Sequence, residues 1–319
     1  MTTETHRSHR RALKLSFGML LLIAGLGAGT APAYEAKTYC GDSGTWIQIL
    51  GAGGSELDDS TASASYLVWR DGKARVLVDP GPGASLLFDL AQARYEDLEA
   101  IVVTNLEVGN SADLPAFARG ALDTPRIEPL RVIGPSGSDA YPDIETFMGR
   151  LFGPEGVYPY LSDTLEGRYD GNRMLVTSVP ARGRKVWSRF ATENLKIGAV
   201  PVNHGAVPAL AYRVDIGDER IVFTGDFNNE KATLATFAEG AEALIINHSI
   251  AESARGRDRD LYIRPSQIGR LAAQIDPRFV ILGHRTGRTR GVESLSRQEI
   301  EKGYSGSLLF ASDMECWGL

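Results

Sequence analysis

The sequence has 319 residues, of which 43% are hydrophobic, so it is ordinary for a globular protein and long enough for one large core. It contains 34 Lys and Arg residues against 40 Asp and Glu residues, a formal net charge of −6. This acidic balance argues against non-specific binding to nucleic acid.

The first 33 residues have the organisation of a secretory signal peptide. Four basic residues precede an apolar run at residues 15–28, and small residues then lead to Ala31-Pro32-Ala33. A membrane anchor is the alternative, but the run is short for a span of about 20 residues. We therefore expect cleavage after Ala33 and a mature chain, residues 34–319, that is periplasmic or secreted and not membrane-bound.

Cleavage would make the mature chain more acidic and place its two cysteines near its ends. Removing four basic residues and one acidic residue leaves 30 Lys and Arg residues against 39 Asp and Glu residues, a net charge of −9. We therefore expect no nucleic-acid partner. Cys40 and Cys316 have no metal-ligand spacing, and in an oxidising compartment they would form a disulfide joining the two ends. Two free thiols are the alternative.

The first half of the mature chain reads as a run of strands followed by alternating helices and strands. Strands are predicted at residues 46–50, 66–69, 76–78, 101–104 and 131–133, and helices at 84–93, 113–120 and 143–151. Residues 138–195 otherwise lack clear periodicity, and we interpret them as an irregular insertion flanking the site.

The second half repeats this rhythm. Strands are predicted at residues 196–202, 210–215, 220–223, 243–246, 279–282 and 308–310, and helices at 230–237, 265–275 and 297–302. Meander strands followed by strand–helix alternation in both halves favour a four-layered αβ/βα sandwich, an α/β fold, formed by a single domain.

Polar side chains follow four of the predicted strands. His204, His248 and His284 each close or follow an apolar strand, and so does Asp226. A lone histidine in such a place is usually hydrogen-bonded to a backbone carbonyl. Four residues at four strand ends favour a shared site, because side chains converge at strand ends in α/β folds.

Specific segments resemble the metallo-β-lactamase superfamily, in the branch of ribonuclease Z, cyclic phosphodiesterases and arylsulfatase-like enzymes. The resemblance rests on residues 48–54 (QILGAGG), 78–83 (VDPGPG), 111–115 (SADLP), 203–213 (NHGAVPALAYR), 224–226 (TGD) and 282–289 (LGHRTGRT). It implies the sandwich fold and a centre of two metal ions, usually zinc, that hydrolyses esters.

The resemblance also implies a role for each matching residue. His204 is expected to be a ligand of the first metal, Asp226 the bridging carboxylate and His284 the last ligand of the second metal. Asp226 and His284 would thereby be catalytic. Asp79 is expected to steady the metal-binding loop from behind.

That loop departs from the family pattern, Thr-His-x-His-x-Asp-His. It lies within IVVTNLEVGNSADLP, residues 101–115, where Asn105, Glu107, Gly109 and Asn110 take the places of His, His, Asp and His. Glycine offers no donor and an amide is a weak zinc ligand, so two tight sites cannot be assembled.

One metal site remains possible. His204, Asp226 and His284, with Glu107 as a further oxygen ligand, could hold one zinc, manganese or iron ion. The alternative is a polar pocket without metal.

Three further residues are candidates for contact with substrate. Arg285 and Arg288 follow His284 within the family-like segment and could pair with a phosphate or sulfate, although arginines on an exposed loop are often only solvated. His248 could line the same pocket.

We therefore expect a hydrolase of a small phosphoester or sulfoester anion with at most one metal and reduced activity. The alternative is a non-catalytic periplasmic binding or scaffolding module.

Overall fold

The structure, a computed structural model, describes residues 40–167 and 173–319. These residues belong to one compact unit, Ala36–Leu319. The predicted signal peptide lies outside the described residues. Within the described part of the chain, no helix is long and apolar enough to cross a membrane.

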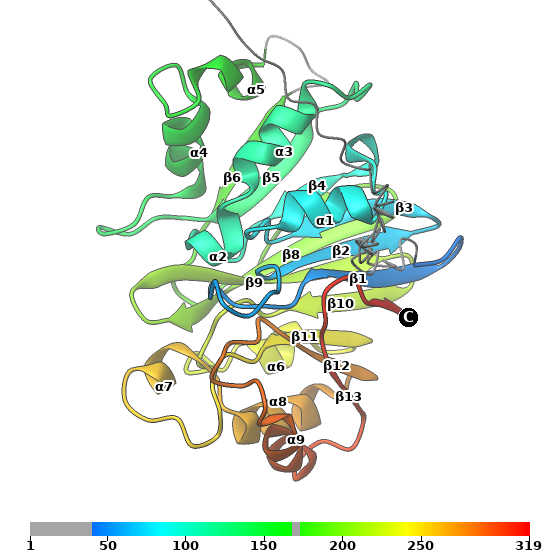
Figure 1. The fold of residues 1–319 in the computed structure, drawn as a ribbon, viewed down its shortest axis with the longest axis vertical. Coiled ribbons are helices and arrows are strands. Elements are labelled where there is room, and N and C mark those ends of the chain that lie inside the picture. The colour runs from blue at the N-terminus through cyan, green and yellow to red at the C-terminus, as the bar shows by residue number, and fades with distance from the viewer. Residues whose placement is uncertain (1–39, 168–172) are drawn as a thin grey trace, which may run out of the picture. The chain divides into compact units, whose positions relative to one another are not determined.

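Two seven-stranded sheets form the centre of this unit (Figure 1). The first has the order β14-β1-β2-β3-β4-β5-β6 and the second the order β13-β12-β11-β10-β9-β8-β7. The first sheet consists of β14 (Cys316–Gly318), β1 (Thr45–Gly51), β2 (Ser65–Arg70), β3 (Lys73–Val78), β4 (Ala100–Val102), β5 (Leu130–Pro135) and β6 (Met174–Val179). The second consists of β13 (Ser307–Phe310), β12 (Phe279–Gly283), β11 (Ala243–Asn247), β10 (Glu219–Phe223), β9 (Val207–Ile216), β8 (Leu195–His204) and β7 (Trp187–Ala191).

Short helices follow most of the strands. In the first half they are α1 (Ala84–Leu90), the 3-10 turn η1 (Tyr95–Asp97), α2 (Val108–Ser111), α3 (Leu114–Ala121), α4 (Ile144–Phe152), the 3-10 turn η2 (Pro159–Leu161) and α5 (Asp163–Glu166). In the second half they are α6 (Leu234–Phe237), α7 (Asp258–Leu261), α8 (Pro265–Ile275) and α9 (Glu293–Glu301).

The apolar residues divide into three clusters that define four layers. One cluster fills the space between the sheets, where Tyr66 of β2 meets Phe223 of β10 with ring centroids 5.6 Å apart. A second lies between the first sheet and helices α1, α3 and α4. The third lies between the second sheet and helices α6, α8 and α9. The predicted four-layered αβ/βα sandwich is confirmed.

Parallel pairing gathers the loops that carry the candidate site. In the first sheet β3, β4, β5 and β6 are parallel, and in the second β10, β11, β12 and β13 are parallel. The carboxyl ends of parallel neighbours meet at one edge of a sheet. Most of the predicted site residues are in the loops after β3, β4, β10 and β12. These loops therefore lie at the edge of each sheet where its parallel strands end.

The segment 138–195 is more regular than its sequence indicates. It contains α4, close to the predicted helix, and also β6 and β7, the edge strands of the two sheets. In β7 the register against β8 shifts between Trp187 and Phe190. Both rings pack against the core between the sheets although they are three residues apart, so the period of two that marks a strand is lost.

A disulfide joins the two ends of the described chain. Cys40 and Cys316 are bonded, with their Cα atoms 5.4 Å apart and a sequence separation of 276. Cys316 begins β14, which pairs with β1. The predicted disulfide is confirmed, and it fastens the C-terminal strand onto the first sheet.

Removing this disulfide should destabilise the fold. We expect Cys40→Ser with Cys316→Ser to lower the free energy of unfolding by about 2–5 kcal/mol, because the bond closes a long loop in the unfolded chain. Urea unfolding with and without reductant measures this. The wild type should lose the same amount in reductant and the double variant nothing; equal stability of both proteins in oxidising buffer would contradict the prediction.

His248 follows β11 and is fully buried beneath α9. Its Nε2 lies 3.0 Å from Ser296 Oγ, and its ring packs against the edge of Phe310. Its Nδ1 has no hydrogen-bond partner among the described residues. Burial, with the positive charge of Arg285, lowers the pKa of His248 to about 4. The ring is therefore neutral at physiological pH.

This histidine should make the fold sensitive to acid. The folded-state pKa lies below the ordinary value of about 6.5, so the unfolded chain binds more protons between pH 6.5 and 4. Its contribution to stability is complete above pH 6.5 and is lost as the pH falls. We expect His248→Gln to reduce the slope of unfolding free energy against pH by up to about 1.4 kcal/mol per pH unit in that window. Unfolding curves with an unchanged slope would refute this.

Candidate metal centre

The loop after β4 is held in place by Asp79, the residue that follows β3. Its two carboxylate oxygens accept hydrogen bonds of 2.7 Å from the backbone N–H and the hydroxyl of Thr104. Asn110 Nδ2 donates to the same carboxylate at 3.0 Å. Burial raises the pKa of Asp79 to about 7, although the bonds from Thr104 and Asn110 oppose it. Asp79 thus fixes both ends of the loop, at the position expected for it from the sequence.

The loop's two amide side chains are committed to hydrogen bonds. Asn105 Oδ1 accepts from the backbone N–H of Glu107 at 2.9 Å, and its Nδ2 donates to Asp226 Oδ2 at 3.1 Å. Asn110 is occupied by Asp79. At Gly109 a Cβ atom would lie 2.3 Å from Ser55 Oγ. Of the four positions in the loop pattern, only Glu107 presents a carboxylate.

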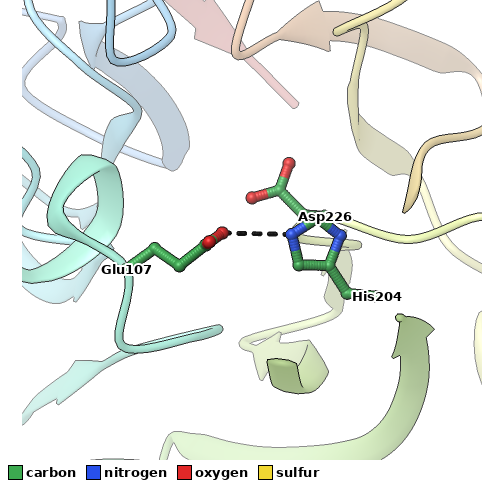
Figure 2. Close-up of side chains that lie close together, drawn as sticks. All are labelled: Glu107, His204 and Asp226. Atoms are coloured by element: carbon green, nitrogen blue, oxygen red, sulfur yellow. Dashed lines mark hydrogen bonds and ion pairs between the residues drawn. The ribbon is translucent and has the colours of Figure 1, made fainter. Parts of the chain in front are cut away.

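Three potential metal ligands converge from different parts of the chain. Glu107 precedes α2, His204 ends β8 and Asp226 follows β10. One ligand atom from each lies within 4.8 Å of the other two. Figure 2 shows the carboxylate of Glu107 directed at the His204 ring, with the carboxylate of Asp226 beside it. His204 and Asp226 are buried, whereas Glu107 is exposed. We refer to these three residues as the triad.

The imidazole of His204 is oriented by a backbone carbonyl. Its Nδ1 lies 3.0 Å from the carbonyl oxygen of Leu261, which can only accept, so Nδ1 carries a proton and donates. Nε2 therefore faces Glu107 Oε2, at 3.1 Å. Tyr262 packs on the ring with centroids 5.2 Å apart. Burial lowers the pKa of His204, but the bond to Glu107 and the charge of Asp226 outweigh it and raise the pKa above its ordinary value.

His284 contacts Asp226 directly. Its Nδ1 lies 3.1 Å from Asp226 Oδ1. The backbone of His284 is in the left-handed region, with φ of 46°. Asn247 Nδ2 lies 3.0 Å from the same carboxylate oxygen and 2.8 Å from His284 Nδ1. Burial lowers the pKa of His284, but Asp226 raises it by more, so the pKa lies above its ordinary value. The structure thus brings His284 to Asp226 as a hydrogen-bonding partner.

The three residues predicted to contact substrate have partners outside the triad. Arg285 pairs with Glu293, donates to the Ala311 carbonyl at 3.2 Å and stacks on Phe310. Arg288 is half exposed, and its Nε lies 3.7 Å from a carboxylate oxygen of Asp258. His248 contacts Ser296. None of the three has a hydrogen bond or ion pair to the triad, and their roles toward substrate stay predictions.

Two contacts in the site were missed from the sequence. Asn247 stands directly before His248 at the end of β11, so the same strand-end signal that marked the histidine also marked the asparagine. The carbonyl of Leu261 left no such signal, because a backbone group can be contributed by any residue type.

Comparison with solved structures supports the fold. The metallo-β-lactamase fold protein YhfI from Bacillus subtilis superposes with a TM-score of 0.65 at 18% identity, covering 86% of this chain and 98% of that one. The short form of human tRNase Z gives 0.64 at 14% identity, with the same coverage. At such identities the likeness concerns the fold alone.

Two curated relatives that the sequence matches are named ribonuclease Z. That of Mycobacterium sp. strain KMS is 29% identical over 204 residues, 62% of this chain and 67% of its own length. That of Pseudomonas putida is 24% identical over 291 residues, 81% of this chain and 91% of its own.

These relatives overturn one expectation. The prediction that the protein binds small anions and no nucleic acid was wrong, because the matched relatives are named ribonucleases. Net charge sums over the whole surface, whereas a binding surface depends on local charge.

A family model decides the assignment. The model described as the beta-lactamase superfamily domain matches residues 74–285, about two thirds of the chain, and this stretch includes all three residues of the triad. The chain belongs to the beta-lactamase superfamily.

Proposed function

We propose that this chain is a phosphodiester hydrolase that uses one divalent metal ion held by Glu107, His204 and Asp226. The observation that carries the proposal is the convergence of two carboxylates and one imidazole within 4.8 Å. The relatives named ribonuclease Z make RNA a candidate substrate. A structural neighbour, PqqB from Methylobacterium extorquens, is titled as Zn(2+)-bound.

The triad fits a single metal ion. His204 donates through Nδ1 to a carbonyl and turns Nε2 toward Glu107, which is how metal-binding histidines are usually held. Two carboxylates balance the charge of a divalent ion. Mixed nitrogen and oxygen ligands suit zinc, manganese or iron(II).

A pair of metals does not fit the same loop. Asn105 directs an N–H, which repels cations, at Asp226, and Asn110 directs its N–H at Asp79. Gly109 has no side chain to contribute. The second ion of the family's centre therefore lacks ligands here, and we infer that hydrolysis is slower than in enzymes with both ions.

A metal ion in the triad and the side chains around it would support hydrolysis together. A divalent ion in the triad would activate a water molecule near neutral pH and polarise a phosphoryl oxygen. Asn105 and Asn247 hold the carboxylate of Asp226 in one orientation. Asp226 raises the pKa of His284 and so favours its protonated form, which donates from Nδ1 to Asp226 and places positive charge beside it. Glu107, the exposed member, is the triad residue most accessible to an incoming substrate.

A non-catalytic module is the second candidate. The observation that favours it is that the charged groups already pair with one another: Glu107 with His204, and Asp226 with His284. With both histidines protonated the four charges cancel, so the site needs no metal to be neutral. Such a protein would bind ligands at the same place without hydrolysing them.

We also propose that the protein is exported. The disulfide between Cys40 and Cys316 supports an oxidising compartment, where such bonds persist. Fractionation of producing cells, with N-terminal sequencing of the product, tests this. A mature chain starting at Tyr34 outside the cytoplasm supports export, and an intact cytoplasmic chain contradicts it.

Metal analysis of untagged protein tests the main proposal. We expect about one divalent ion per chain, lost on His204→Ala and bound at least tenfold more weakly by Glu107→Gln. Hydrolysis of bis(p-nitrophenyl) phosphate should disappear with a chelator and return with zinc or manganese.

Matched controls exist for both substitutions. His248→Gln also removes one imidazole, and Glu128→Gln also removes one exposed carboxylate, but neither residue contacts the triad. Both variants should keep the metal. A folded wild type that binds no metal and hydrolyses no phosphodiester would favour the non-catalytic module.

Restoring the family pattern should create the second metal site. We expect Asn105→His, Glu107→His, Gly109→Asp and Asn110→His together to raise metal content to about two ions per chain and phosphodiesterase activity at least tenfold. Ser55→Ala belongs in the same variant, because its Oγ would lie 2.3 Å from the new Cβ at position 109. Ser55→Ala alone is the control. A folded quintuple variant with unchanged metal content would show that the loop has been placed wrongly.

A further inference from the structure

We propose that the turn between β6 and β7 binds the phosphate backbone of a nucleic-acid strand that reaches the triad. This basic turn comprises residues 180–186 and carries Arg182, Arg184 and Lys185. The inference deepens the proposed hydrolase function. It rests on that function for the cleavage of the bound strand at the triad. Its own evidence is the charge, exposure and position of the turn.

The turn is a concentration of positive charge in an acidic protein. Residues 174–192 contain four basic residues and no acidic one, whereas the whole chain has a net charge of −6. The three cations of the turn are all exposed. Within the described residues they form no ion pair and no hydrogen bond. Unpaired cations on a surface are the groups that neutralise phosphates.

Sheet topology places the turn at the same edge as the metal-binding loop. β4, β5 and β6 are parallel neighbours, so the loops that follow them emerge side by side. The loop after β4 carries Glu107, and the basic turn follows β6, two strands away. With strands about 4.8 Å apart, their ends are separated laterally by roughly 10 Å.

A lysine also connects the turn to the strand that bears His204. Lys231 Nζ donates to the Val202 carbonyl at 3.0 Å and lies 3.5 Å from the Ala181 carbonyl. Val202 precedes His204 by two residues on β8, and Ala181 precedes the first cation of the turn. The basic turn therefore begins close to β8, the strand that ends at His204.

A cavity of about 480 Å³ lies between the basic turn and the loop after β5. Arg182 lines it on one side, and Ser138, Asp139, Tyr141 and Thr146 line it on the other. Asp143, also in its wall, is occupied as the N-cap of α4 by the backbone N–H of Thr146. The cavity offers an aromatic ring and hydroxyls that suit a base and its sugar. Its two carboxylates, Asp139 and Asp143, disfavour a phosphate there, so the phosphates are expected on the cations of the turn.

Three cations on one turn fit a chain of phosphates better than a single one. A small phosphoester in the triad would leave them unused, whereas a strand passing over the turn would meet each in succession. The neutralising charge is then local, so an overall acidic protein can still hold a polyanion.

Binding of a fluorescein-labelled single-stranded RNA of 20 nucleotides, measured by anisotropy with a chelator present, tests this. We expect Arg182→Gln, Arg184→Gln and Lys185→Gln together to weaken binding at least about tenfold at low salt. The slope of log affinity against log salt should become less steep by about 2, since each phosphate contact on a single strand contributes about 0.7.

A charge-matched triple variant is the control. Lys73→Gln, Lys196→Gln and Arg270→Gln remove the same charge from exposed residues outside the turn and should leave the affinity within about twofold. Equal loss in both variants, or no RNA binding by the wild type, would overturn the proposal. So would wild-type binding to vesicles containing phosphatidylglycerol without binding to RNA.

The measurement separates this inference from the hydrolase proposal. RNA binding that is lost in the turn variant but kept by His204→Ala supports the basic turn even where no hydrolysis is detected. Hydrolysis of bis(p-nitrophenyl) phosphate with no RNA binding would support the hydrolase proposal and refute the proposed role of the basic turn.

Discussion

The site depends on a buried carboxylate that must be compensated. Asp226 lies in the loop after β10 of the second sheet and is almost inaccessible to water. An ionised carboxylate there is costly unless it is paired and hydrogen-bonded. Asn105, Asn247 and His284 meet this need, and they come from the loop after β4, the end of β11 and the loop after β12. Burial acts to raise the pKa of Asp226, but the positive charge and hydrogen bond of His284 hold it well below its usual range.

This arrangement ties the two sheets together at one edge. Asn105 belongs to a loop of the first sheet, and its partner follows a strand of the second. The same loop is fixed from behind by Asp79, so the position of Glu107 relative to His204 is set by both sheets. The triad is therefore a consequence of the sandwich closing correctly, and any change that shifts one sheet against the other would separate its ligand atoms.

Much of the fold could be predicted because its central strands are apolar and its loops carry strong turn residues. Strands such as β10 and β12 are followed closely by polar residues, and this pattern identified Asp226 and His284 as candidates. Of the edge strands, β13 was predicted, whereas β6, β7 and β14 were not. β7 contains a bulge and exposes most of its residues, and β14 has only three residues and depends on its pairing with β1 and on the disulfide.

The candidate site was predictable in its members but less so in its geometry. The residue types identified His204, Asp226 and Glu107, which the structure brings together. They could not show that His284 would bond to Asp226, because that depends on where two loops meet in space. The error over nucleic acid has a similar origin, since a sum of charges carries no information about where the charges lie.

Protons and a metal ion compete for the same atoms in the triad. Because Nδ1–H is already donated to Leu261, the bond between His204 Nε2 and Glu107 needs a second proton, carried by Nε2 or by the carboxyl group. A metal ligand needs that same nitrogen unprotonated. Glu107 and Asp226 raise the pKa of His204. The same two carboxylates would attract the metal ion. Acid therefore favours the self-paired, metal-free arrangement and alkali favours the metal, so one constellation of side chains can support either state without rearranging the fold.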